Sequence, residues 1–137
     1  MTEWHIYIDG ASSCNPGESG AGIVVYDQGG EEIDRKSIYL GEMTNNMAEY
    51  EALLHALKEA ERASIKNVFI YTDSLLVANQ IPGKYKTNNH ILKKYVEKAR
   101  NIIQTLNRFE LQYIPREKNR LADKLAKEAV NKKGVDG

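Results

Sequence analysis

The stretch WHIYID (residues 4–9) decides the fold, because apolar and polar side chains alternate along it up to the acid at its end. A period of two is typical of a β-strand with one buried face. A turn rich in glycine and serine follows over residues 10–20. Residues 22–26 and 32–40 then have the pattern of two further strands, joined by a diglycine hairpin turn. These segments predict an antiparallel meander of three strands.

After the meander the period changes to that of a helix. Apolar residues recur every three or four positions over residues 47–60, which predicts an amphipathic helix of about four turns. The run VFIYT (68–72) is almost continuously apolar, as in a strand that is covered on both faces. Similar patterns predict helices over residues 74–80, 90–106 and 119–132, and a fifth strand over residues 109–114.

Strands that are separated by helices need crossover connections, so strands four and five are expected to join the meander in parallel. The predicted fold class is α/β, with a five-stranded mixed sheet covered by helices on both faces. We expect a single domain over residues 1–132 and a tail, residues 133–137, that frays.

Length and composition exclude several classes of protein. The 137 residues suit one domain, and no apolar run approaches the ~20 residues of a membrane helix. The first nine residues lack the apolar core of a signal peptide. The single cysteine, Cys14, suits a reducing compartment. We expect a cytoplasmic monomer with no membrane association.

The charges balance overall, at 19 basic and 19 acidic residues, but they are unevenly distributed. Residues 84–100 carry six cations against one anion, whereas residues 42–61 carry five glutamates against one lysine. This distribution fits a nucleic-acid enzyme with an acidic metal site. It fits two solvated helix faces as well.

Four acids lie next to surface that we expect to be buried. Asp9 ends the first strand, and Asp73 directly follows the fourth. Glu49 lies on the core-facing edge of the first long helix, and Asp123 lies in the first turn of the last one. A carboxylate beside buried surface is costly unless it is paired or bound to a metal. A helix cap and a salt bridge could account for two of these acids, but four invite a shared explanation.

If the four acids converge, they need counter-ions. Two carboxylates ~4 Å apart repel by about 4 kcal/mol at an effective dielectric near 20. Oxygen ligands select Mg²⁺ or Mn²⁺, and the three histidines and one cysteine have no zinc-site spacing. Two such ions can activate water and stabilise a leaving oxygen. The residues themselves therefore favour metal-dependent phosphodiester hydrolysis.

The chain also carries five short motifs: YIDGA (7–11), CNPG (14–17), TNNMAE (44–49), TDS (72–74) and NRLAD (119–123). In order and spacing they resemble the successive signatures of the type 1 ribonuclease H family, across essentially the whole chain. The resemblance implies the ribonuclease H fold. It also implies an endonuclease that cuts the RNA strand of an RNA–DNA hybrid and leaves 5′-phosphate and 3′-hydroxyl ends.

By this resemblance the four acids would bind metal. Asp9, Glu49, Asp73 and Asp123 would hold two Mg²⁺ ions, which Mn²⁺ could replace. Asp9 would bridge both ions, with Glu49 and Asp73 on one side and Asp123 on the other.

The resemblance likewise implies a substrate surface. Asn15, Asn45 and Asn46 would lie at the minor groove of the hybrid, and Thr44 with Asn46 would bind a phosphate of the DNA strand. An RNA minor groove exposes 2′-hydroxyls, which amide side chains bind without reading sequence. The same residue types are also suited to turns and helix caps.

The chain departs from the family pattern in three places. The connection over residues 115–118 is too short for the flexible loop that carries a histidine in many members, so we assign Arg116 a contact to the scissile phosphate or the leaving group. An ion pair between Arg116 and a neighbouring glutamate is the alternative. Leu75 stands where members often have a glutamine that contacts the minor groove. The basic protrusion of some members is absent, which leaves Lys84 and Lys86 to reach phosphates.

Two other functions remain open. One is a related nuclease of the same fold with relaxed specificity, acting on double-stranded RNA or DNA. The other is a catalytically silent module that binds duplexes. Retention of all four acids disfavours the silent module, because a binding protein gains nothing from clustered negative charge.

Overall fold

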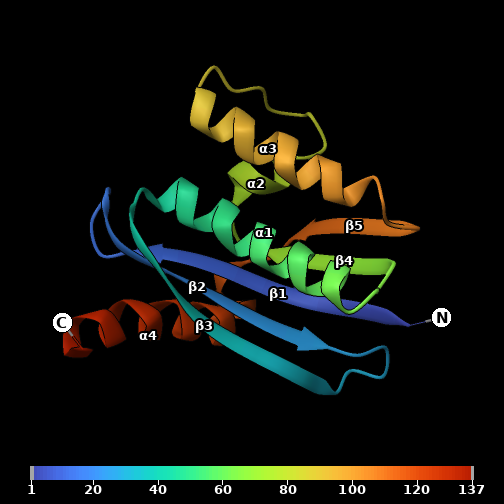
Figure 1. Cartoon of the computed structure of the whole chain (residues 1–137), viewed down its shortest axis with the longest axis horizontal. Coiled ribbons are helices and arrows are strands. Elements are labelled where there is room, and N and C mark those ends of the chain that lie inside the picture. The colour runs from blue at the N-terminus through green and yellow to red at the C-terminus, as the bar shows by residue number, and fades with distance from the viewer. Residues whose placement is uncertain (1, 137) are drawn as a thin grey trace.

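The structure is a computed structural model that describes residues 2–136, with side chains over residues 2–132. Its elements follow in the order β1 (Glu3–Ser12), β2 (Gly17–Tyr26), β3 (Glu32–Met43), α1 (Asn45–Arg62), β4 (Asn67–Thr72), α2 (Leu75–Gln80), α3 (His90–Ile103), β5 (Arg108–Tyr113), η1 (Arg116–Lys118) and α4 (Arg120–Asp136). The strands form one sheet in the order β3-β2-β1-β4-β5. Helices α1, α2 and α3 lie on one face of the sheet and α4 on the other (Figure 1). The predicted fold class is confirmed.

The meander is antiparallel as predicted, but its strands are longer than the sequence pattern indicates. β1 runs to Ser12 and β2 begins at Gly17, so most of the predicted glycine-rich turn is strand. The reason is the packing of α4 on this part of the sheet. A Cβ on Gly20, which lies inside the predicted turn, would be 2.4 Å from the carbonyl oxygen of Ala126 in α4. A glycine at this position therefore permits close helix packing rather than a turn.

β4 and β5 join the meander in parallel, β4 beside β1 and β5 beside β4. The ladder between β1 and β4 ends at the pair Ile8 and Thr72. Asp9 does not end its strand as predicted, because it continues the ladder with β2 opposite Gly22. It is instead the first residue of β1 beyond the ladder with β4. Asp73 is the first residue beyond the same ladder on β4, so both acids lie at one edge.

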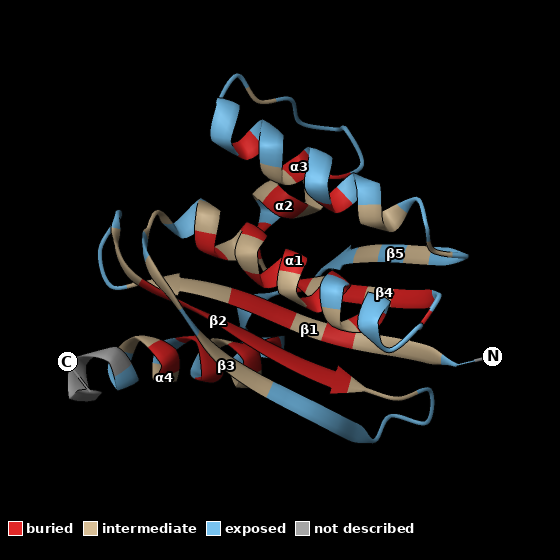
Figure 2. Ribbon diagram, viewed as in Figure 1, coloured by how far each residue is buried: buried red, intermediate tan, exposed pale blue. Residues whose placement is uncertain are grey.

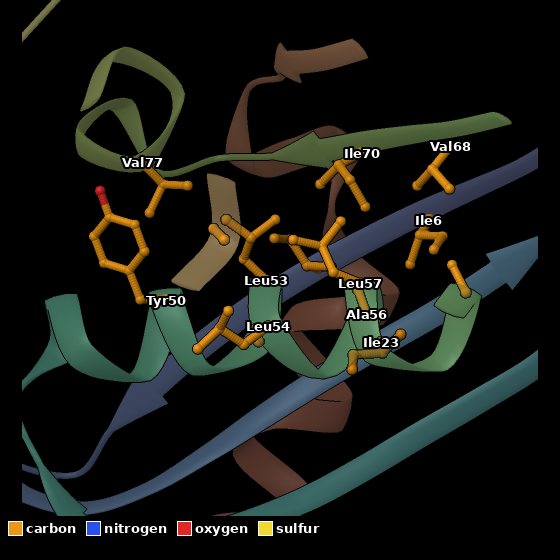
Figure 3. Close-up of a cluster of buried hydrophobic side chains, with 14 of the residues drawn as sticks. Ile6, Ile23, Tyr50, Leu53, Leu54, Ala56, Leu57, Val68, Ile70 and Val77 are labelled. Atoms are coloured by element: carbon orange, nitrogen blue, oxygen red, sulfur yellow. The ribbon is translucent and has the colours of Figure 1, made fainter. Parts of the chain in front are cut away.

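The main core lies between α1 and the sheet. Figure 3 shows Leu53 and Leu57 of α1 beside Ile6 of β1 and Ile70 of β4, and all four belong to one cluster of fully buried side chains. On the other face α4 buries Ala122 and Leu125 against β2. Burial is concentrated in α1 and the central strands, whereas the outer face of α3 is exposed (Figure 2). The carboxylate-bearing edge is thereby attached to the most rigidly packed part of the molecule.

Side-chain caps fix where the helices begin. The Thr44 hydroxyl accepts a hydrogen bond from the backbone N–H of Met47 (3.2 Å) at the start of α1, and the Ser74 hydroxyl accepts one from Val77 (3.2 Å) at the start of α2. The short helix η1 was not predicted. α3 ends at Ile103, three residues before the predicted end, and α4 extends beyond the end predicted at residue 132. The tail expected to fray, residues 133–137, lies outside the described side chains.

Within residues 2–136, no helix combines the length and the apolar character that a bilayer crossing requires.

Candidate active site

Three of the four acids come together at the edge where β1 and β4 separate. Asp9, Glu49 and Asp73 each offer a carboxylate oxygen, and these oxygens lie within 4.8 Å of one another. Asp9 is buried, with 5 % of its surface exposed, and the other two are half-buried. The sequence predicts this convergence. The role of the three residues as metal ligands stays a prediction.

Glu49 reaches the cluster because α1 lies directly on β1. A Cβ on Gly10 would lie 2.3 Å from the backbone carbon of Ala48, so only glycine permits this approach. The backbone N–H of Gly10 then donates a hydrogen bond of 2.5 Å to Oε1 of Glu49. Gly10 thus fixes Glu49 beside Asp9, its own neighbour in the chain.

Asp123 joins the cluster from the α4 side of the sheet. It lies close enough to Asp9 to raise the pKa of that carboxyl group. It also forms an ion pair with Lys127 one helical turn later, with Nζ and Oδ2 3.0 Å apart. The Lys127 side chain is largely exposed, so this pair offsets little of the negative charge at the site. Asp123 therefore lies next to the three-acid cluster, close to Asp9.

The cluster holds more negative charge than its surroundings neutralise. Burial raises the pKa of Asp9, and the charges of Glu49 and Asp73 raise it further. Burial also raises the pKa of Glu49, although the hydrogen bond from Gly10 acts in the opposite direction. Groups in this state either take up protons or bind cations. An all-oxygen donor set of this kind fits a hard divalent cation such as Mg²⁺ or Mn²⁺.

Arg116 lies near enough to the cluster to act on it. It begins η1, which two residues separate from the end of β5, and its side chain is exposed. Its positive charge acts on Glu49, whose pKa it lowers against the effect of burial. Arg116 is therefore close enough to influence Glu49 electrostatically from outside the cluster.

Asn119 is a member of the site that the sequence did not reveal. In the sequence it lies at the start of the last predicted helix and in the motif NRLAD (119–123), and it has no assigned role there. In the structure its side chain is buried, and Nδ2 donates to the carbonyl oxygen of Ile8 (2.8 Å) and to Oδ2 of Asp73 (3.2 Å). Its Oδ1 is buried without a hydrogen-bond partner among the described residues. The available signal was its position four residues before Asp123, which a capping role explains equally well.

A family model described as reverse transcriptase-like matches residues 7–129. The chain belongs to this ribonuclease H-like family. A protein named ribonuclease HI from Halobacterium salinarum is 35 % identical over 127 residues, which are 93 % of this chain and 64 % of that protein. A protein named bifunctional protein Rv2228c from Mycobacterium tuberculosis is 32 % identical over 127 residues, 92 % of this chain but 35 % of its own length. The chain therefore spans less than two thirds of these two relatives.

Solved structures of the family share the fold closely. The crystal structure of RNase H1 from H. salinarum superimposes with a TM-score of 0.92 at 34 % identity, covering 95 % of this chain and 98 % of that one. LC11-RNase H1 in complex with an RNA/DNA hybrid gives a TM-score of 0.88 at 38 % identity, covering 94 % and 97 %. The predicted ribonuclease H fold and family are confirmed.

In this member of the ribonuclease H-like family, the predicted substrate residues are tied to one another. The side-chain oxygen of Asn15 accepts from the backbone N–H of Asn45 (3.0 Å), and that of Asn45 accepts from Ser12 (3.1 Å). These bonds join the β1–β2 turn to the start of α1. Thr44 caps α1, and Asn46 is exposed in its first turn. The turn and cap chemistry expected of these residues is present, and their contacts to substrate stay a prediction.

The two predicted lysines lie away from this surface, after α2. Both are exposed. Lys86 lines a hollow of about 510 Å³ together with Lys93 and Arg100 of α3. Arg100 is itself engaged, since its guanidinium donates to the carbonyl oxygen of Ile81 (2.9 and 3.0 Å). Three of the six cations that the sequence shows over residues 84–100 therefore line this hollow, together with Glu97.

Proposed function

We propose that this chain is a metal-dependent endonuclease that hydrolyses the RNA strand of RNA–DNA hybrids and leaves 5′-phosphate and 3′-hydroxyl ends. The observation that carries the proposal is the convergence of the Asp9, Glu49 and Asp73 oxygens within 4.8 Å, with Asp123 close enough to raise the pKa of Asp9. Membership of a family with relatives named ribonuclease H supports it. So does the likeness to LC11-RNase H1, whose structure includes an RNA/DNA hybrid.

In the proposed reaction, water adds to the scissile phosphorus and the bond from phosphorus to O3′ breaks. The phosphate stays on the 5′ end of one product, and O3′ of the other takes up a proton. Asp9, Glu49, Asp73 and Asp123 would hold two divalent cations, Mg²⁺ or, in its place, Mn²⁺. When bound, such ions supply an activated water and stabilise the charge on the leaving oxygen.

The chain's own residues hold and select the substrate. Asn15, Asn45 and Asn46 bind the minor groove, where amide groups can donate to and accept from 2′-hydroxyls. Their backbone and side-chain links keep this surface in place before substrate arrives. Thr44 with Asn46 binds a phosphate of the DNA strand. Lys84 and Lys86 contact phosphates farther along the duplex, so binding weakens as salt concentration rises.

Arg116 binds the scissile phosphate or the leaving group. Its charge already acts on Glu49 from outside the cluster, which is where an entering phosphate would stand. A guanidinium there neutralises charge as it develops on the phosphate oxygens.

A second function, cleavage of double-stranded RNA, is favoured by one observation. Leu75, next to the Ser74 cap, is 54 % exposed at the start of α2 and offers no hydrogen bond to a ribose. Selectivity for a hybrid over an RNA duplex is expected to be weaker as a result.

The test incubates end-labelled RNA–DNA hybrid, double-stranded RNA and double-stranded DNA with the protein in EDTA, Mg²⁺ or Mn²⁺. Asp9→Asn is the inactive variant, and Asp34→Asn, which removes an exposed acid from β3, is the matched control. The expected result is metal-dependent cutting of the RNA strand of the hybrid that Asp9→Asn loses and Asp34→Asn keeps. Cutting of DNA alone, or hybrid binding without scission, would overturn the proposal.

A further inference from the structure

We propose that Asn119 is a positioning residue for this reaction, because its amide holds the Asp73 carboxylate in the orientation that the metal site requires. The inference rests on the proposed function. Asn119 is not one of the four acids, and it would act on the reaction through Asp73.

The place of the amide in the sheet explains what it holds. The ladder of β1 and β4 ends at Ile8 and Thr72, and beyond this pair the two strands bear Asp9 and Asp73. Nδ2 of Asn119 donates to the carbonyl oxygen of Ile8 and to Oδ2 of Asp73. One side chain therefore ties the two strands together at the point where their backbone pairing stops. An amide nitrogen has two hydrogens, so both are used.

The bond to Asp73 restricts the rotation of its carboxylate. Oδ2 is held by Asn119, and the same carboxylate contributes an oxygen to the cluster with Asp9 and Glu49. Bonds of this kind, from a neighbouring polar group to a ligating carboxylate, orient the ligand and tune metal affinity.

The backbone of Asn119 also contacts the fourth acid, Asp123. Its N–H donates to the carbonyl oxygen of Arg116 (2.9 Å), and its own carbonyl oxygen accepts from the N–H of Asp123 (3.1 Å). Asn119 thus stands between η1 and α4, with Asp123 fixed by its backbone and Asp73 by its side chain. Displacing it would disturb both sides of the cluster.

The unpartnered Oδ1 argues that this residue is not kept for stability. A buried acceptor without a donor is unfavourable, and an apolar side chain would avoid that penalty. Aspartate has the same shape but would set an oxygen against the Ile8 carbonyl and the Asp73 carboxylate. Among residues of this shape, only asparagine supplies two N–H donors to these two acceptors.

The test measures Mn²⁺ binding by titration calorimetry without nucleic acid, in wild type, Asn119→Ala and Asn119→Asp. Asn67→Ala is the control, because Asn67 is also buried but lies at the far end of β4. We expect both Asn119 variants to bind Mn²⁺ about 10–100-fold more weakly and Asn67→Ala to bind as wild type does. With hybrid, the Asn119 variants should lose kcat while KM stays within about twofold.

A double-mutant cycle separates positioning from general destabilisation. If Asn119 acts through Asp73, then Asn119→Ala should weaken Mn²⁺ binding much less in an Asp73→Asn background than in wild type. Should Asn119→Ala fail to fold, Asn119→Leu, which is close in shape and adds neither a cavity nor a charge, is used in the same cycle.

The outcomes distinguish this inference from the function on which it rests. If wild type cuts hybrid and the Asn119 variants bind Mn²⁺ with wild-type affinity, the positioning role is wrong and the function stands. Additive losses in the cycle would also overturn the role. If wild type neither binds Mn²⁺ nor cuts hybrid, the proposed function falls and the inference with it.

Discussion

Replacing Asp9 with asparagine is expected to make the metal-free protein more stable, although it removes a central residue of the proposed site. The oxygens of Asp9, Glu49 and Asp73 lie within 4.8 Å of one another. At an effective dielectric near 20, two full charges about 5 Å apart repel by about 3 kcal/mol. Asp9 takes part in two such pairs.

Part of this repulsion is relieved by protonation, since burial and the neighbouring charges raise the pKa of Asp9. We therefore expect Asp9→Asn to raise the free energy of unfolding by about 1–3 kcal/mol. For a domain of this size that is roughly 3–12 °C in Tm.

The pH dependence has a definite sign. Because the pKa of Asp9 is higher in the folded chain than its ordinary value, the folded chain holds a proton that the unfolded chain has released. The stability of metal-free wild type therefore falls as pH rises from about 4 towards alkaline values. Mg²⁺ opposes this trend, and at ten times its Kd it adds about 1.4 kcal/mol. Asp9→Asn should flatten the pH dependence and lose most of the gain from Mg²⁺.

The measurement is thermal unfolding followed by circular dichroism at pH 5, 7 and 9, in EDTA and in Mg²⁺. Asp34→Asn is the control for losing one negative charge elsewhere. If Asp9→Asn in EDTA is no more stable than Asp34→Asn, or if the stability of wild type in EDTA rises with pH, the acids do not repel one another as the structure implies.

Three further changes test other parts of the account. Gly22→Ala should lower the free energy of unfolding in urea by at least about 2 kcal/mol, because the new Cβ would lie 1.9 Å from the carbonyl oxygen of Ala122. Gly29→Ala is the control and should be nearly neutral, since its Cβ would have its nearest neighbour 3.5 Å away. Equal effects of the two substitutions would contradict the packing argument. Arg116→Ala should lower kcat more than about twofold at unchanged folding. Since Arg116 lowers the pKa of Glu49, the substitution should also shift the acid limb of the pH–rate profile to higher pH, and Arg116→Lys should recover part of both effects. A loss of kcat below twofold would show that Arg116 does not contact the scissile phosphate or the leaving group. Lys84→Ala combined with Lys86→Ala should raise KM and reduce the slope of log affinity against log salt by about 1–2; an unchanged slope would show that these lysines touch no phosphate.

The fold could be predicted because its signals are local. The alternation over residues 4–9 and the helical period over 47–60 each depend on neighbouring residues only, and the parallel addition of β4 and β5 follows from chain connectivity. The lengths of β1 and β2 could not be predicted in the same way. Gly20 belongs to a stretch with the local signature of a turn. In the structure it is a strand residue whose missing Cβ leaves room for α4, a helix about one hundred residues later in the chain.

In the site, too, local sequence patterns reveal some residues and not others. Asp9 and Asp73 are visible in the sequence because each acid interrupts or follows an apolar run. Asn119 is not visible, because a helix-start asparagine with a capping role and one that bridges two strands have the same local sequence. Only the meeting of β1, β4 and α4 decides between them.

The most direct test of the central claim is anomalous X-ray diffraction from crystals of Asp123→Asn bound to an RNA–DNA hybrid in Mn²⁺. This variant keeps Asp9, Glu49 and Asp73 and is expected to slow cleavage. The account predicts an anomalous peak within bonding distance of oxygens from these three residues, beside a phosphate of the RNA strand. A well-ordered hybrid with no Mn²⁺ at these oxygens would contradict it.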